Sequence, residues 1–283
     1  QQPRRTWGEV YLAFKNPKVI SLLFLGLSAG IPILLIFSTL SVWLREAGVS
    51  RATIGFFSWA ALGYAFKFIW APLIDKLPVP ILSHLLGRRR AWLLISQFLI
   101  ILSLLLMATS DPNQSLAALA IFAVILGFSA ATQDIVIDAY RIEVADVDLQ
   151  GIMSSAYIAG YRVGMLVAGA GALELAGFFD GGNGYILAAW SKTYIAMAVV
   201  MGIGVLTTCV ISEPKATGSD DRYLKSNTDY LRFLGCFLFV AGAFILAFTI
   251  STDLVDESKS YLIKNIFLAP QLASFLVEAL RLC

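Results

Sequence analysis

Long apolar runs recur along this chain between short polar stretches, and they limit what it can fold into. A helix that crosses the hydrocarbon core of a bilayer needs about 20 mostly apolar residues. The composition agrees, with 58% hydrophobic residues, 14% charged residues and a mean hydropathy of +0.78, whereas a soluble domain is about half apolar and about one quarter charged. The sequence therefore predicts an all-α polytopic membrane protein. Its spans are expected over residues 18–43, 53–73, 91–109, 115–138, 152–177, 190–211 and 231–252.

The polar stretches divide these runs into a group of six and a seventh. We expect a cytoplasmic N-terminal segment over 1–17, a six-helix bundle over 18–212, a cytoplasmic linker over 213–230 and the start of a second bundle over 231–283. The stretch after residue 252 begins with polar residues and ends with a moderately apolar segment, which fits either an eighth span or an interfacial helix. Because the first residue is Gln1, we expect the true N-terminus to lie upstream.

The distribution of Lys and Arg predicts the orientation, because cytoplasmic loops of membrane proteins are enriched in these residues. With the N-terminus inside, the inner segments hold thirteen Lys and Arg and the outer segments hold five. We therefore expect a cytoplasmic N-terminus.

Only a few ionisable residues lie well inside the predicted spans: Lys67, Asp134 and Arg162. A charge at the centre of a membrane helix costs about 3 kcal/mol on insertion scales, so such groups face a bundle interior or a water-filled cavity. Lys67 and Asp134 are predicted at similar distances from the inner ends of their spans and could pair, whereas Arg162 lies near the midplane. Gln133 lies beside Asp134, and Asp138 ends the span one turn later.

Two interpretations of these charges stay open. They could be buried ion pairs that fix the register of the helices, or they could handle a substrate or protons. The second is favoured, because intramembrane ionisable groups are functional by default and because Arg162 has no evident partner. The pairs Gly26 and Gly30, and Gly160 and Gly164, predict close contacts between helices, either for packing or for sliding.

Other classes of function are disfavoured. A net charge of +2 does not indicate nucleic-acid binding. Cys209, Cys236, Cys283 and the single His84 have no metal-ligand spacing, so we expect no metal and no cofactor. Asp134 and Asp138 share one predicted helix, which does not fit an intramembrane aspartyl hydrolase. We expect that the protein is not an enzyme.

Six helices, a polar linker and a seventh helix are the layout of half a major facilitator transporter plus the start of its second half. The loop after the second predicted span resembles a motif of that superfamily. Its matching residues are Asp75, Lys76, Gly87, Arg88, Arg89 and Arg90, with Ala71 in place of the first Gly and "LPVPILSHLL" inserted. The resemblance implies a six-helix bundle of 3+3 inverted repeats and an inner gate that latches one conformational state. Asp138 and Arg141, at the inner rim, are assigned to the same gate.

Within the superfamily, several stretches resemble the AmpG-like muropeptide permeases: "TIGFFS", "YAFKFIWAPLID", "GRRRAWLL", "SAATQDIVIDAYRIEV" and "GYRVGMLVAG". This resemblance implies a proton-driven carrier of the inner membrane that imports GlcNAc–anhydroMurNAc muropeptides for peptidoglycan recycling and influences β-lactamase induction. By the same likeness, Lys67, Gln133, Asp134 and Arg162 are the predicted substrate and proton pathway. Asp134 is the predicted proton carrier, and Arg162 or Lys67 is predicted to hold a substrate carboxylate.

Two alternatives remain. One is a related carrier of another anionic substrate, similar to acetyl-CoA transporters. The other is a truncated membrane protein that does not transport, because the family likeness fades after about residue 216. A half-transporter would have to dimerise or to gain the missing C-terminal half in order to enclose a cavity.

Overall fold

The computed structural model describes residues 14–57, 60, 62–144, 147–181, 185–214, 228–229, 231–240, 242–243 and 246. The chain divides into two compact units, Gln1–Asp221 and Arg222–Cys283. In the second unit a short apolar helix covers Leu231–Val240. Most of the predicted linker, the rest of the seventh predicted span and the C-terminal stretch after it lie outside the described residues.

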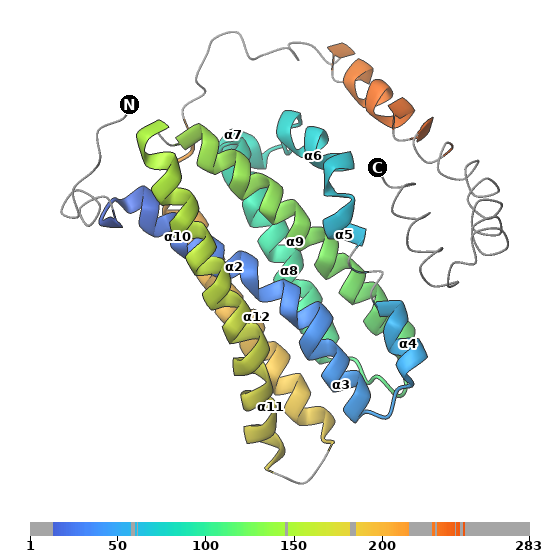
Figure 1. Ribbon diagram of the computed structural model, residues 1–283. Coiled ribbons are helices and arrows are strands. Elements are labelled where there is room, and N and C mark those ends of the chain that lie inside the picture. The colour runs from blue at the N-terminus through green and yellow to red at the C-terminus, as the bar shows by residue number, and fades with distance from the viewer. Residues whose placement is uncertain are drawn as a thin grey trace, which may run out of the picture. The chain divides into compact units, whose positions relative to one another are not determined.

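The first unit is a helical bundle, and the described residues contain no β-strand. Five of its helices are long and apolar enough to cross a membrane: Pro17–Glu46, Arg88–Ala108, Leu116–Val144, Asp148–Asp180 and Leu187–Val210. They confirm the all-α polytopic class. Figure 1 shows them as a set of steeply inclined helices in which α2 (Pro17–Leu34) runs beside α10 (Val147–Leu166). The others are α8 (Arg88–Ala108), α9 (Leu116–Val144) and α12 (Leu187–Val210).

Two of these helices contain a π-helical segment. The first span runs from α2 through η1 (Leu35–Thr39) into α3 (Leu40–Glu46). The fourth of the five, Asp148–Asp180, runs from α10 through η3 (Val167–Gly171) into α11 (Ala172–Asp180). The segments η1 and η3 are neighbours, and Thr39 Oγ1 donates a hydrogen bond of 2.7 Å to the carbonyl of Ala168. A π-helical turn shifts the backbone hydrogen-bond register and frequently marks a functional site.

The continuous helix predicted over 53–73 is not observed. Its place is taken by α4 (Arg51–Phe56), α5 (Leu62–Ala65) and α6 (Lys67–Lys76), and the described backbone leaves helical geometry at Phe66, where φ is −100° and ψ is 10°. Gly63 lowers the helical propensity of this stretch, and Pro72 supplies no backbone N–H. A short helix, α7 (Leu82–Leu86), also forms within the loop that was predicted to follow.

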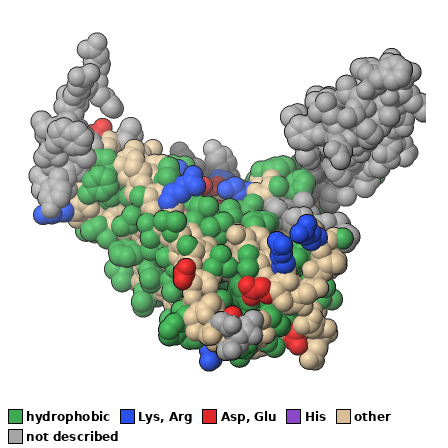
Figure 2. All heavy atoms as spheres, turned by 60° about the horizontal axis from the view of Figure 1, so that its bottom comes forward, with side chains coloured by type: hydrophobic (Ala, Val, Ile, Leu, Met, Phe, Trp, Pro, Cys, Tyr) green, Lys and Arg blue, Asp and Glu red, His purple; other side chains and the backbone are tan. Residues whose placement is uncertain are grey.

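The closest helix contact in the unit is between α2 and α10. A Cβ atom added at Gly26 or Gly30 would overlap the backbone of Tyr157 or Tyr161, and Gly160 lies in the same way against Leu23. This confirms the close packing predicted from the glycine spacing. Outside these contacts the unit is largely apolar on its surface, and Figure 2 shows a face dominated by hydrophobic side chains with few charged groups.

Candidate functional site

Asp134 is a buried carboxylate in the middle of the bundle. It lies on α9, its residue is 7% exposed, and its Oδ1 accepts a hydrogen bond of 3.3 Å from the Tyr157 hydroxyl on α10. Lys67, at the start of α6, lies close enough for its charge to act on Asp134. The two residues form no ion pair within 4.0 Å in the described structure. The structure therefore brings Lys67 near Asp134, as predicted, but does not join them directly.

Contacts between the interrupted second span and α9 place Lys67 there. A Cβ at Gly63 would lie 2.9 Å from the backbone of Gly127, so α5 approaches α9 closely. On α6, Trp70 Nε1 donates a hydrogen bond of 3.2 Å to Thr132 Oγ1. These two contacts hold the break at Phe66, and the residues that flank it, against α9.

Three tyrosines that were not predicted as site residues interact with the carboxylate, one by a hydrogen bond and two electrostatically. Tyr157 donates to Asp134, while Tyr64 and Tyr161 lie within electrostatic range of it. The Tyr64 hydroxyl is buried and has no hydrogen-bond partner in the described part of the chain. Tyr157 and Tyr161 lie one helical turn apart in an apolar run, and this spacing could have indicated from the sequence that they share a face of the helix.

Gln133 points away from Asp134, as neighbouring residues on a helix do. Its Nε2 donates to Ser28 Oγ at 3.0 Å, and its buried Oε1 has no partner among the described atoms. Gln97 lies in the same buried layer, accepts a hydrogen bond from Thr208 Oγ1 at 3.0 Å and leaves its own Nε2 unpartnered. The predicted carboxamide therefore belongs to a polar layer inside the bundle.

Arg162 is exposed on α10 and does not reach Asp134. Its described contact is a weak hydrogen bond of 3.8 Å from Nη1 to the sulfur of Met165. Of the five membrane-spanning helices, the one that carries Arg162 is the least buried, with 28% of its apolar window inside the unit. An arginine near the middle of a span is not stable against lipid, so this face is suited to water or to another part of a protein.

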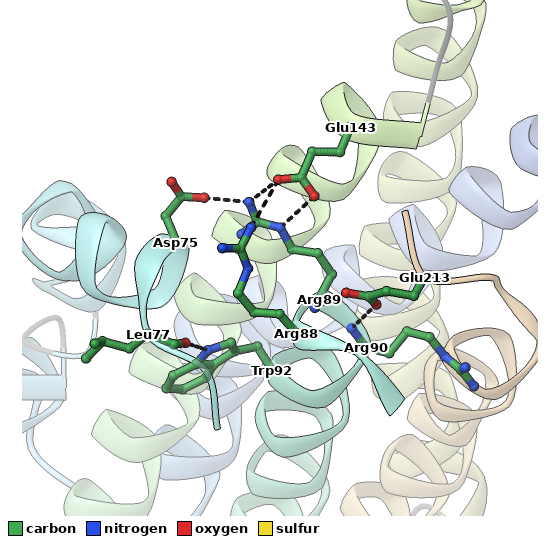
Figure 3. Close-up of polar contacts among 8 residues, drawn as sticks. All are labelled: Asp75, Leu77, Arg88, Arg89, Arg90, Trp92, Glu143 and Glu213. Carbon is green, nitrogen blue, oxygen red and sulfur yellow. Dashed lines mark hydrogen bonds and ion pairs between the residues drawn. The ribbon is translucent and has the colours of Figure 1, made fainter. Parts of the chain in front are cut away.

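At one end of the bundle, Arg89 is the centre of an ionic network (Figure 3). Its guanidinium binds Asp75 at 2.5 Å and both oxygens of Glu143, although only 3% of its side chain is exposed. Arg88 adds a longer contact of 3.5 Å to Glu143. The network joins the end of α6, the start of α8 and the end of α9. Glu143 and Asp75 together compensate the buried cation, as a buried charge requires.

A second carboxylate, Glu213, caps α8 from outside the helix. Its side chain accepts hydrogen bonds from the backbone N–H groups of Arg89 at 2.8 Å and Arg90 at 3.1 Å. The first N–H groups of a helix have no partners within it and favour a negative charge. Arg90 in turn donates to the carbonyls of Thr208 and Cys209 at the end of α12. Figure 3 shows Glu213 beside Arg89 and Arg90 at the start of α8.

Gly87 makes this arrangement possible. Its φ is +91°, and a Cβ atom there would collide with the side chain of Glu213. Asp138, Arg141 and Lys76 were also predicted for the gate. Arg141 pairs with Asp138 at 3.4 Å and donates to Ser154 Oγ at 2.6 Å, and Lys76 is the last residue of α6. The sequence motif indicated the basic half of the network and Asp75, whereas Glu213 was not predicted as its partner.

Comparisons of the sequence show which known proteins this chain resembles. The sequence model of a family described as acetyl-coenzyme A transporter 1 matches residues 18–115, and that of a family described as sugar (and other) transporter matches residues 73–208. The chain is 38% identical over 200 residues to a Rickettsia felis protein named transporter AmpG 4, covering 71% of this chain and 46% of the relative. It is 36% identical over 204 residues to the anhydromuropeptide permease of Escherichia coli, covering 72% of this chain and 39% of the relative.

Over these residues the chain is similar to the AmpG-like permeases of the major facilitator superfamily. The relatives are named as transporters and permeases, not as enzymes. The AmpG-like chain spans less than half the length of these two relatives.

Proposed function

We propose that the full-length protein is a proton-coupled permease of the inner membrane that imports GlcNAc–anhydroMurNAc muropeptides for peptidoglycan recycling. The observation that carries this proposal is Asp134, a buried carboxylate that lies near a cation and forms no ion pair with it. A carboxylate that served only to fix helix register would be expected to pair directly with its cation. One that exchanges protons has to exist in both the charged and the neutral form.

The proposed roles follow from exposure and charge. Asp134 carries the proton. Lys67 favours the charged form of Asp134, and release of the proton restores the electrostatic attraction between the two residues. Arg162, exposed on the least covered helix, binds a carboxylate of the muropeptide peptide, since a guanidinium is suited to bidentate carboxylate recognition. Gln133 supports the site from the polar layer behind it and does not contact substrate.

The network around Arg89 is proposed as the inner gate. It ties the ends of three helices at the end of the bundle where α2 begins, and Lys18 at that end donates to the carbonyl of Val144. With a cytoplasmic N-terminus, this end faces the cytoplasm.

The orientation can be tested by cysteine labelling. In a chain whose native cysteines are replaced by serine, an impermeant thiol reagent added from the periplasm should label Arg45→Cys and not Lys15→Cys. The opposite labelling would contradict the orientation.

Uptake of labelled GlcNAc–anhydroMurNAc by cells that lack their own permease tests the substrate. The full-length protein should produce accumulation that an uncoupler abolishes, while an empty vector should not. Absence of accumulation, with the protein present in the membrane, would contradict the proposal.

A second candidate is a carrier for acetyl-CoA or a similar anionic thioester, because the matched acetyl-coenzyme A transporter family covers residues 18–115, including Lys67 and the break beside it. Proteoliposomes that contain the protein distinguish the two substrates. Uptake of labelled acetyl-CoA in preference to the muropeptide would favour this candidate.

A further inference from the structure

The buried carboxylate at Asp134 has two tyrosine neighbours whose hydroxyl groups differ in hydrogen bonding. Tyr157 already donates to Asp134 Oδ1, at 3.3 Å. Tyr64 is a partly buried residue of α5 within electrostatic range of the same carboxylate, and its buried hydroxyl has no partner in the described part of the chain. Leaving a buried hydroxyl unsatisfied costs about 1–3 kcal/mol, so a native unpaired group calls for an explanation.

The backbone around each tyrosine gives it a defined place. The carbonyl of Tyr157 lies against Gly26 on α2, where any Cβ would displace it. Tyr64 is held by the contact of its neighbour Gly63 with Gly127 on α9. It also lies two residues before the break at Phe66, and Lys67 follows that break directly. Discontinuous helices near the membrane midplane are a recurrent source of substrate and coupling-ion groups in transporters.

We propose that Tyr157 and Tyr64 are positioning residues that stabilise opposite protonation states of Asp134. This rests on the proposed role of Asp134 as the proton carrier. Tyr157 donates to the carboxylate and so stabilises the charged form. When Asp134 is protonated, its O–H becomes a donor that needs an acceptor, and the hydroxyl oxygen of Tyr64, unpartnered in the described part of the chain, supplies one after a movement at the break. The proton stays on Asp134, and neither tyrosine is ionised.

The other groups that face Asp134 do not make this distinction. Lys67 on α6 acts on its charge from one side, and Asp138 acts from one turn along α9. Tyr161 on α10 lies within range and has a ring contact with Tyr157 at 6.0 Å, but it makes no hydrogen bond to Asp134. Tyr161 is therefore a matched control, since it lies one turn from Tyr157 on the same helix.

The test is an infrared titration of the purified full-length protein in lipid. The carboxylic-acid C=O band of Asp134 is identified by its loss in Asp134→Asn, and its intensity is followed against pH. Tyr157→Phe should move the midpoint upward by about one pH unit, which corresponds to a tenfold change in proton affinity, because the charged form loses a donor. Tyr64→Phe should move the midpoint in the opposite direction, because the protonated form loses its acceptor. Tyr161→Phe should leave it near the wild-type value.

Midpoint shifts of opposite sign in Tyr157→Phe and Tyr64→Phe would separate this role from general damage to the structure. General damage gives no reason for the two midpoints to move in opposite directions. Equal midpoints in wild type, Tyr157→Phe and Tyr64→Phe would overturn the inference, as would shifts of the same sign. If one variant fails to fold, the direction of the midpoint shift in the other variant still tests the role proposed for that tyrosine. The titration does not require transport, so a failure of the proposed function can be told apart from a failure of this inference. If the proposed function is wrong, the Asp134 band titrates with the expected shifts, but uptake does not depend on protons.

Discussion

Among single residues, Arg89 and Arg88 form a natural comparison, because adjacent arginines share one carboxylate in different surroundings. Arg89 is 3% exposed in its side chain and binds both Asp75 and Glu143, whereas Arg88 is 37% exposed and lies 3.5 Å from Glu143. We predict that Arg89→Gln lowers the free energy of unfolding by about 3–5 kcal/mol, since it leaves two carboxylates without their buried cation. Arg88→Gln should cost less than about 1 kcal/mol. Thermal or denaturant unfolding in detergent measures both.

Adding Glu143→Gln to Arg89→Gln provides the internal check. The double variant should recover part of the loss, because one of the two uncompensated carboxylates is removed. Equal losses for Arg88→Gln and Arg89→Gln would show that the network does not depend on burial.

Part of the site could be predicted from single residues, and part could not. Lys67, Asp134 and Arg162 stand out because an ionisable side chain in an apolar run has few explanations. A tyrosine in an apolar run is not unusual, so Tyr64 gave no comparable signal; only the fold shows that it lies within electrostatic range of Asp134 and that its hydroxyl has no partner among the described residues. The position of Gln133 was also not predictable, since it depends on which face of α9 meets Ser28.

At the level of elements, the start of α8 depends on a glycine that serves two purposes. Gly87 has a φ of +91° and also leaves room for Glu213, while Gly48 has a similar φ of +82° with open space around it. Both Gly→Ala variants introduce backbone strain of about 1 kcal/mol or more. We predict that Gly87→Ala costs distinctly more, because it also displaces the carboxylate that caps α8.

The comparison is read from unfolding of the two variants in the same detergent. Gly48→Ala controls for the strain alone. A loss for Gly87→Ala no greater than that for Gly48→Ala would contradict the capping role of Glu213.

The contact between the two π-helical segments is a second test at this scale. Thr39 donates across to Ala168, which lies on a different helix, whereas Thr193 is equally buried but donates to Ala189 on its own helix. We predict that Thr39→Val costs about 1–3 kcal/mol, because Val has nearly the same shape and removes only the donor. Thr193→Val should cost less, because the carbonyl of Ala189 is already within a helical ladder. Similar losses in both variants would contradict a special role for the contact.

The elements show where sequence patterns are sufficient. Five of the seven predicted spans correspond to helices that are long and apolar enough to cross a membrane, because run length follows directly from bilayer thickness. The break at Phe66 and the segments η1 and η3 were not predicted. They arise where helices meet, as α5 meets α9 and η1 meets η3, and such contacts are not encoded in the local pattern of hydrophobicity.

For the molecule as a whole, the same two helices carry both the proposed proton site and the proposed gate. Lys67 and Asp75 lie at the two ends of α6, and Asp134 and Glu143 both lie on α9. A change in the charge of Asp134 alters its attraction to Lys67, and a shift of α6 would move Asp75 relative to Arg89. We therefore expect Asp75→Asn to weaken the coupling between proton movement and uptake. The ratio of protons to substrate, measured in proteoliposomes, should fall while the amount of inserted protein stays the same; an unchanged ratio would contradict this link.

The central claim is that Asp134 carries the transported proton. The most direct test is substrate-driven proton movement in proteoliposomes, followed with a pH-sensitive dye after addition of GlcNAc–anhydroMurNAc. The full-length protein should acidify the lumen as substrate enters. Asp134→Asn, inserted to the same level, should give no acidification. Proton movement by Asp134→Asn equal to that of the wild-type protein would contradict the account.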